Sequence, residues 1–286
     1  MSDPVGSQLY DAAYNGSVSE LSSLLRNHPE INVNWTNVSE ETPLHAASSY
    51  GSVEGVKLLL AHPDINVNLK NSNGKTPFSF GCEYGRVPVV RLLLKDPRVD
   101  VTLEDDWGGT PLWYASWYGE GEVIEWLVAS GRDLGDVKNK NGKYWDGEEY
   151  TTLEIARKNC KTEVVSVLER FMANPEHTRH ELRVKLGVVD EQAAEGFALT
   201  VFLCDGLLQL KPALTTTTTA SAATDASRFF GIASKLPMEL QMILCHRAVC
   251  SMKQNILQRD SECSCWGLVH VRQEQGFAFF CFLFFP

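Results

Sequence analysis

The sequence predicts an all-α solenoid of stacked helix-turn-helix units with short hairpin-like turns, followed by a C-terminal helical segment. Two observations predict this fold. A triplet of Thr, Pro and an apolar residue recurs at a constant interval, at 42–44, 76–78 and 110–112. Seven positions after the apolar residue of each triplet comes a glycine: Gly51, Gly85 and Gly119. A fixed period of this kind is typical of repeat arrays, in which each unit buries its apolar face against the next.

Further columns extend the repeat to five copies over residues 5–172. A small residue follows each lead residue by three positions: Ala12, Ala47, Gly81, Ala115 and Ala156. A leucine follows the glycine column by eight positions: Leu24, Leu59, Leu93, Leu127 and Leu168. The first and fifth copies lack the Thr-Pro pair, as terminal repeats often do, because one of their faces meets solvent or another domain.

Each unit should fold locally in the same order. Threonine caps the first helix, and proline at the first helical position loses no hydrogen bond. The glycine ends that helix in a conformation that suits a residue without a β-carbon. The second helix carries an aliphatic stripe that only a neighbouring repeat can bury. Polar segments such as Asn71–Lys75 then form the turns between repeats.

One connection departs from the period. The step from Leu112 to Leu153 is seven positions longer than the step from Phe78 to Leu112. The surplus lies in residues 138–150, which we interpret as an enlarged loop between the fourth and fifth repeats.

The segment Thr42-Pro43-Leu44-His45-Ala46-Ala47 resembles the ankyrin-repeat signature. Tetratricopeptide repeats share the period, but their aromatic and alanine pattern is absent. The resemblance covers residues 5–172 and implies recognition of a protein partner without catalysis. It also implies that the histidine ties the turn together by hydrogen bonds. The other repeats have Tyr10, Ser79, Trp113 and Glu154 at this position, so we expect them to be looser.

The resemblance implies that partners contact the turn tips and the two residues before the glycine of each first helix. Seven candidate partner-binding residues follow from these positions: Tyr50, Glu83, Tyr84, Trp107, Trp117, Tyr118 and Lys158. Tyrosine and tryptophan are frequent interface anchors because they bury much apolar surface and lose little rotamer freedom. The three tyrosines stand one repeat period apart and would form a ladder along the concave face.

The alternative for these rings is packing between neighbouring repeats. We favour packing for Trp113, which stands in the histidine column, and partner contact for Trp117. For the three tyrosines, both alternatives remain open.

Charge indicates the kind of partner. The net charge is −10, and residues 1–172 hold 16 Lys and Arg against 25 Asp and Glu. An acidic array excludes nucleic acid, whose binders need clustered basic residues, and favours a basic protein partner. The segment Met1–Gly6 is polar and unlike a secretory signal, so we expect an intracellular protein, cytoplasmic or nuclear, with reduced cysteines.

Neither catalytic residues nor a cofactor or metal site emerges from the motifs. The chain has no Gly-x-x-x-x-Gly-Lys loop and no Gly-x-Ser-x-Gly elbow. The single residue between Cys263 and Cys265 does not fit zinc ligation, which needs two to four residues between paired cysteines. His177, His180 and Glu181 stand in the wrong order for a metalloprotease helix. We therefore expect no enzyme, cofactor or metal.

The region after the repeats divides by composition. Residues 173–212 form a helical segment that we expect to cap the array, with apolar stretches too short to span a bilayer. Residues 213–227 form a Thr/Ser/Ala linker that we expect to be disordered. Residues 228–262 are predicted to be helical, and 263–286 form an apolar tail.

Two features of this region suggest alternatives. Residues 236–244 resemble the opening of an F-box, which would make the chain a substrate adaptor of a ubiquitin ligase core; the alternative is a helix that packs locally. The tail is rich in Phe, Leu and Pro, whose codons are rich in pyrimidines. Our hypothesis is that the tail is a gene-model artefact from a translated intron; the alternative is an aromatic tail that buries in a partner or membrane surface.

Overall fold

The computed structural model describes residues 4–139, 141–192 and 194, and it contains five helix pairs. The first helices of the pairs are α1 (Pro4–Tyr14), α3 (Pro43–Tyr50), α5 (Pro77–Glu83), α7 (Pro111–Tyr118) and α9 (Thr152–Lys158). The second helices are α2 (Val18–Asn27), α4 (Val53–Leu60), α6 (Val87–Lys95), α8 (Gly121–Ala129) and α10 (Thr162–Ala173). These pairs confirm the predicted all-α repeat solenoid.

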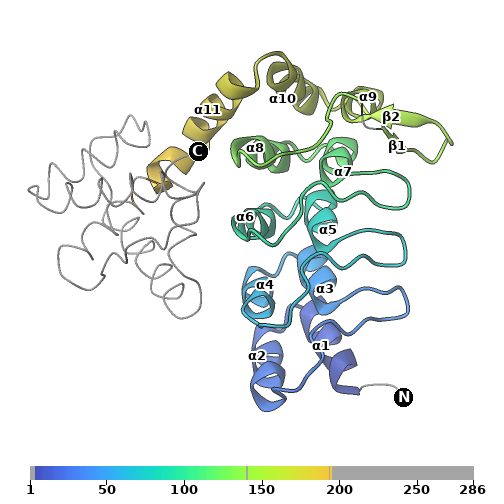
Figure 1. Ribbon diagram of the computed structural model, residues 1–286, viewed down its shortest axis with the longest axis vertical. Helices are drawn as coiled ribbons and strands as arrows, with labels where there is room; N and C mark the ends of the chain where they lie inside the picture. The colour runs from blue at the N-terminus through green and yellow to red at the C-terminus, as the bar shows by residue number, and fades with distance from the viewer. Residues whose placement is uncertain (1–3, 140, 193, 195–286) are drawn as a thin grey trace, which may run out of the picture. The chain divides into compact units, whose positions relative to one another are not determined.

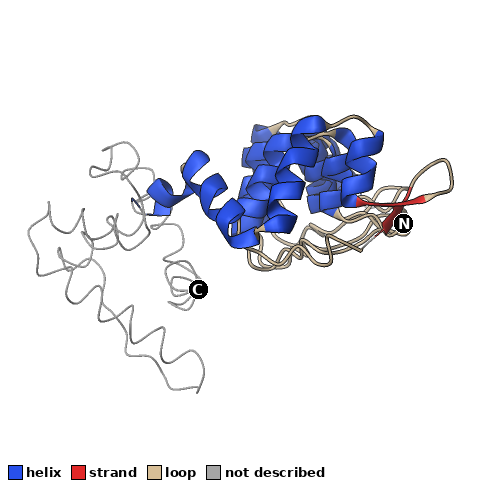
Figure 2. Cartoon of the chain, turned by 90° about the horizontal axis from the view of Figure 1, so that it is seen from above, coloured by secondary structure: helices blue, strands red, loops and turns tan. Residues whose placement is uncertain are grey.

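The two sets of helices form two parallel rows, and the turns between repeats project from the row of first helices (Figure 1). Each first helix packs on the next one, from α1 on α3 to α7 on α9. The view from above shows the two helical layers with the loops gathered along one edge (Figure 2). We call the surface shared by the first helices and the turns the concave face.

The helix ends follow the predicted chemistry. The hydroxyls of Thr42, Thr76 and Thr110 each accept a hydrogen bond from the backbone N–H three residues later. Gly51 adopts a left-handed conformation with φ 92° just after α3. Cys160, which replaces the glycine in the fifth repeat, is also left-handed, with φ 55°. The backbone therefore requires this turn even where the residue is not glycine.

The aliphatic stripes of the second helices make the core. The leucine column is buried in repeats two to five, at Leu59, Leu93, Leu127 and Leu168. Full burial of one such side chain contributes about 1.5–3 kcal/mol. The stacking of neighbouring repeats is thus the main source of stability, and it fixes the row of first helices that carries the candidate site.

The enlarged loop holds an unpredicted two-stranded antiparallel sheet, which spans residues 141–151. Strand β1 (Asn141–Lys143) pairs with β2 (Glu149–Thr151), with Gly142 opposite Tyr150. Gly142 lies against the indole of Trp113, where a β-carbon would come within 2.7 Å of the ring. The enlarged loop is thus a hairpin built onto the fourth repeat, and we call it the inserted hairpin.

The histidine column shows how one repeat is tied to the next. Nε2 of His45 lies 3.0 Å from the carbonyl oxygen of Lys75, just before the cap of the next first helix. Trp113 donates from Nε1 to the carbonyl oxygen of Tyr150, at 2.8 Å and at the same place relative to the following cap. We expected repeats without the turn histidine to be looser. In the fourth repeat, however, the indole of Trp113 supplies the hydrogen bond that the histidine makes in the second. Trp113 is buried, as the packing alternative predicts.

After the fifth pair comes α11 (Pro175–Lys185), whose Glu181 pairs with Arg170 of α10 at 3.0 Å. The remaining predictions lie outside the described residues: residues 195–212 of the segment 173–212, the linker 213–227, the segment 228–262 with its F-box-like residues 236–244, and the tail 263–286. Among the described residues, no helix has the length and apolarity needed to cross a bilayer.

Candidate partner-binding site

The turn tips are held rigid by a column that the sequence analysis missed. The side-chain oxygens of Asn37, Asn71 and Asp105, which occupy equivalent positions in successive repeats, each accept backbone N–H groups two and four residues later. Their periodic recurrence, together with the turn preference of Asn and Asp, was the available signal. Adjacent tips are also joined: Lys143 N donates to Trp107 O at 2.9 Å. The tips therefore form a preorganised edge along the array.

The three tyrosines of the ladder lie on the concave face with much of their surface exposed. Tyr50 is 54% exposed, Tyr84 48% and Tyr118 43%. Tyr14, at the end of α1, is 57% exposed and extends the row, although the sequence analysis did not select it. Each ring also packs within the array, since Tyr50 lies against Gly16 of the preceding repeat and Tyr84 stacks on Phe80. Packing and partner contact therefore both stay open for these rings.

A groove of about 540 Å³ lies where α1, α3 and α5 meet. Its aromatic lining is Tyr10, Tyr14, Tyr50, Phe80 and Tyr84. Neighbouring rings on one helix stack, with centroids 6.3 Å apart for Tyr10 and Tyr14 and 6.0 Å apart for Phe80 and Tyr84. The hydroxyl of Tyr10 donates to Glu41 at 2.8 Å, which fixes that ring. The groove is therefore walled by aromatic rings, four of which carry a hydroxyl group.

The opposite end of the concave face is an aromatic cluster shared with the inserted hairpin. Trp117 contacts Trp113, Tyr144 and Trp145, with ring centroids 4.9–5.0 Å apart, and Tyr118 at 5.3 Å. Trp117 is thus half-buried, so it serves packing as well as any contact. Its exposed partner is Trp145, which is 77% exposed and was not selected from the sequence.

The other candidates are placed differently. Trp107 lies on a turn tip and is 46% exposed. Glu83 is buried, with its carboxylate 2.7 Å from Nζ of Lys75. We therefore remove Glu83 from the proposed contact residues, because an ion pair removed from water is needed by the fold. Lys158 is an exposed residue, but Asp146 and the hydroxyl of Tyr150 hold its ammonium at 2.9 and 2.8 Å.

The electrostatics of the concave face are negative around the tyrosines. Burial raises the pKa of Tyr84, and the carboxylates of Glu83 and Glu41 raise it further. Burial and Glu83 likewise raise the pKa of Tyr118 to about 12. These phenols are therefore neutral at physiological pH and lie close to carboxylates.

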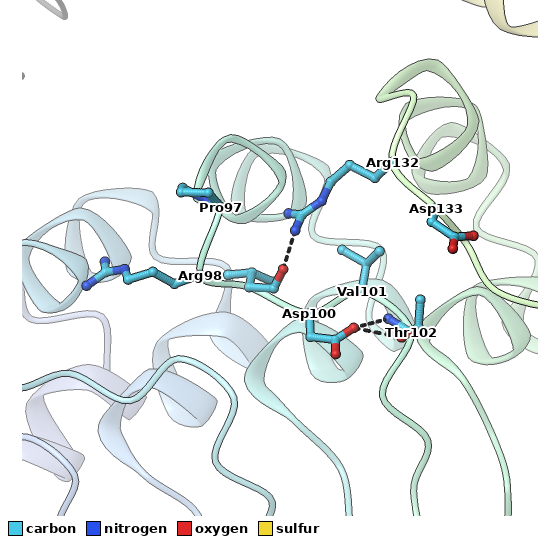
Figure 3. Close-up of a pocket in the computed structure, with 8 residues that line it drawn as sticks. Pro97, Arg98, Asp100, Val101, Thr102, Arg132 and Asp133 are labelled. Atoms are coloured by element: carbon cyan, nitrogen blue, oxygen red, sulfur yellow. Dashed lines mark hydrogen bonds between the residues drawn. The ribbon is translucent and has the colours of Figure 1, made fainter. Parts of the chain in front are cut away.

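A second hollow of about 410 Å³ lies on the connection between α6 and the turn that follows it (Figure 3). Its two cations are engaged with the protein itself. The guanidinium of Arg132 donates to the carbonyl oxygens of Leu94, Asp96 and Val99. Arg98 pairs with Asp96 and donates to the carbonyl oxygen of Leu60. Asp100 accepts from the backbone and hydroxyl of Thr102. The polar groups of this hollow thus stabilise the connection itself. In this respect the hollow differs from the groove on the concave face.

Potential metal ligands do not gather in the described part of the chain, which holds no group of three or more His, Cys, Asp or Glu residues placed around a common point. Of the cysteines there, Cys82 is buried and Cys160 is exposed, and both are free thiols.

Comparison with known proteins identifies the repeat. The family model described as ankyrin repeats, in three copies, matches residues 9–105 and 64–141. These matches span the first four helix pairs, including the groove and the tyrosine row. No curated protein matches the chain.

Proposed function

Since the chain belongs to the ankyrin-repeat family, we propose that it is a binding module that holds a protein partner on its concave face. Ankyrin repeats generally mediate protein–protein interaction, and the family is typically non-enzymatic. The proposal adds to this general role a location on the array, which extends from the groove along the tyrosine row to the inserted hairpin.

One observation carries the proposal: Tyr14, Tyr50, Tyr84 and Tyr118 leave about half of their surface in water, on successive first helices. The exposed half of each ring is available to a partner. Tyr and Trp are enriched at interfaces because their rings bury large areas with few rotatable bonds. The rigid tips add preorganisation, so little entropy is lost when a partner binds.

The acidic character of the array supports a basic partner surface. Charges that complement each other across an interface accelerate association and select among partners. The adaptor alternative depends on residues 236–244, which lie outside the described residues, so it stays a prediction from the sequence.

Site-specific photo-crosslinking tests the location. A photoreactive phenylalanine analogue is placed in the full chain at Tyr50, Tyr84 or Tyr118, and at Lys57 on α4 as a matched control. Lys57 is exposed but belongs to the row of second helices. We expect one common protein to be crosslinked from all three tyrosine positions and not from Lys57. Equal crosslinking from Lys57, or different proteins at each tyrosine, would contradict a binding site on the concave face.

A further inference from the structure

We propose that the concave face accepts a proline-rich, basic peptide segment in the polyproline II conformation, with one residue of each turn seated on one tyrosine of the row. This inference rests on the proposed function and specifies its partner. Three properties of the surface carry it: its spacing, the chemistry of its rings and its charge.

The spacing comes from the stacking of the repeats. Tyr50, Tyr84 and Tyr118 occupy one column and lie at the ends of first helices that pack on one another in a row (Figure 1). Axes of packed helices are about 8–10 Å apart. Equivalent tyrosine rings therefore recur at about that interval along the concave face.

This interval between the rings suits one backbone conformation of a bound peptide better than the others. A polyproline II helix has three residues per turn and rises about 3.1 Å per residue, so each turn advances about 9 Å. A β-strand returns to the same face after two residues, about 6.6 Å. An α-helix returns after one turn of about 5.4 Å. Of these repeats, one polyproline II turn lies within the interval of the tyrosines, whereas about two turns of an α-helix advance about 10.5 Å, slightly beyond it.

The ring chemistry suits the same ligand. Proline-rich segments bind grooves lined by aromatic rings, and they lose little entropy because their conformation is already formed. The groove between α1, α3 and α5 is lined by five such rings, together with N–H donors from Asn15 and Arg86. A polyproline II backbone makes no internal hydrogen bonds, so its carbonyl oxygens can accept from these donors. One donor is already used by the protein, since Nε of Arg86 donates to Ser49 O at 2.8 Å.

Charge decides which residues should flank the prolines. Glu41 lines the groove, and the exposed carboxylates of Glu40 and Asp106 stand on the turn tips. Arg86 and Lys70 are opposing cations, but residues 1–172 have 25 acidic against 16 basic residues. A Lys or Arg between prolines is therefore attracted to the tips, whereas an acidic residue at that place is repelled.

The experiment uses fluorescein-labelled 12-residue peptides and the full chain, with binding followed by fluorescence polarisation at a fixed salt concentration. The probe is four copies of Pro-Lys-Pro. One control, four copies of Gly-Lys-Gly, keeps the charge and removes the polyproline II preference; the other, four copies of Pro-Glu-Pro, keeps the conformation and reverses the charge. We expect the probe to bind at least about tenfold more tightly than either control.

The variant Tyr50→Ala/Tyr84→Ala should weaken binding of the probe by about tenfold or more, whereas Lys57→Ala should not. Both tyrosines are half-exposed, so the melting temperature should stay close to that of the wild type, and this is measured in parallel. Tyr84→Ala alone serves as a second variant, with a smaller loss expected.

The inference is overturned if the probe fails to bind, if Gly-Lys-Gly binds as well as Pro-Lys-Pro, or if the tyrosine variant binds unchanged. These failures differ from a failure of the proposed function. In one outcome, the tyrosine positions crosslink to one common protein while the peptide does not bind. This result keeps the concave face as the binding site and rejects only the proline-rich ligand. Crosslinks that come equally from Lys57 reject both.

Discussion

The buried His45 should make the stability of the array depend on pH. Its Nδ1 lies 3.0 Å from the backbone N of Thr42 and accepts from it, so the ring proton belongs on Nε2, which donates to Lys75 O. Burial lowers the pKa of His45 from 6.5 to about 4, because a charged ring would lose its contact with water. The hydrogen bond to Lys75 and the nearby Glu41 oppose this shift without reversing it.

The direction and the size of this change in stability follow from the pKa values of His45 in the unfolded and the folded chain. The unfolded chain binds a proton at His45 below pH 6.5, whereas the folded chain does so only near pH 4. Unfolding therefore takes up a proton in this window, so the stability is fully present above pH 6.5 and is lost as the pH falls towards 4. At 1.36 kcal/mol per pH unit, His45 accounts for about 2 kcal/mol of loss at pH 5 and about 3 kcal/mol at pH 4.

Urea unfolding of the full chain at pH 7 and pH 5, followed by tryptophan fluorescence, measures this loss. The control is His45→Gln, which is less stable at both pH values but has no imidazole to protonate. Exposed carboxylates and histidines titrate equally in both proteins, so the difference between them isolates His45. We expect the wild type to lose about 2 kcal/mol more than the variant between the two pH values. Equal losses in the two proteins would refute the assigned protonation state.

Three further predictions concern the array. Trp113→Phe should lower the free energy of unfolding by about 1–3 kcal/mol, because Tyr150 O loses its buried donor; denaturant unfolding measures it, and an unchanged value would contradict the role of the indole. Gly142→Ala should cost about 1–3 kcal/mol through its clash with Trp113, and Trp113→Phe should relieve part of that cost in a double-mutant cycle. Glu83→Gln should cost about 3 kcal/mol by removing the carboxylate that balances the buried charge of Lys75, and adding Lys75→Met should restore most of it; a double variant as unstable as the single one would contradict this account.

The placement of the candidate site followed partly from the sequence. The column of Tyr50, Tyr84 and Tyr118 follows from the period, because residues one period apart occupy equivalent places in a stacked array. Their exposure did not follow, since a ring in this column can equally pack on the next repeat. Glu83 shows the limit most directly: it stands beside Tyr84 in the sequence, yet its carboxylate is buried against Lys75.

The sequence by itself determined the repeat, its helix pairs and their ends, because caps, prolines and left-handed turn residues act within a few positions of one another. The tertiary structure decided which side chains join one repeat to the next. Trp113 replaces the turn histidine by reaching a carbonyl far along the chain, which required the inserted hairpin to present Tyr150 and to place a glycine against the indole. The groove between α1, α3 and α5 likewise arises from rings on three helices. Such contacts depend on the direction and packing of side chains that are distant in the chain. The residue types at equivalent repeat positions do not specify that direction or packing.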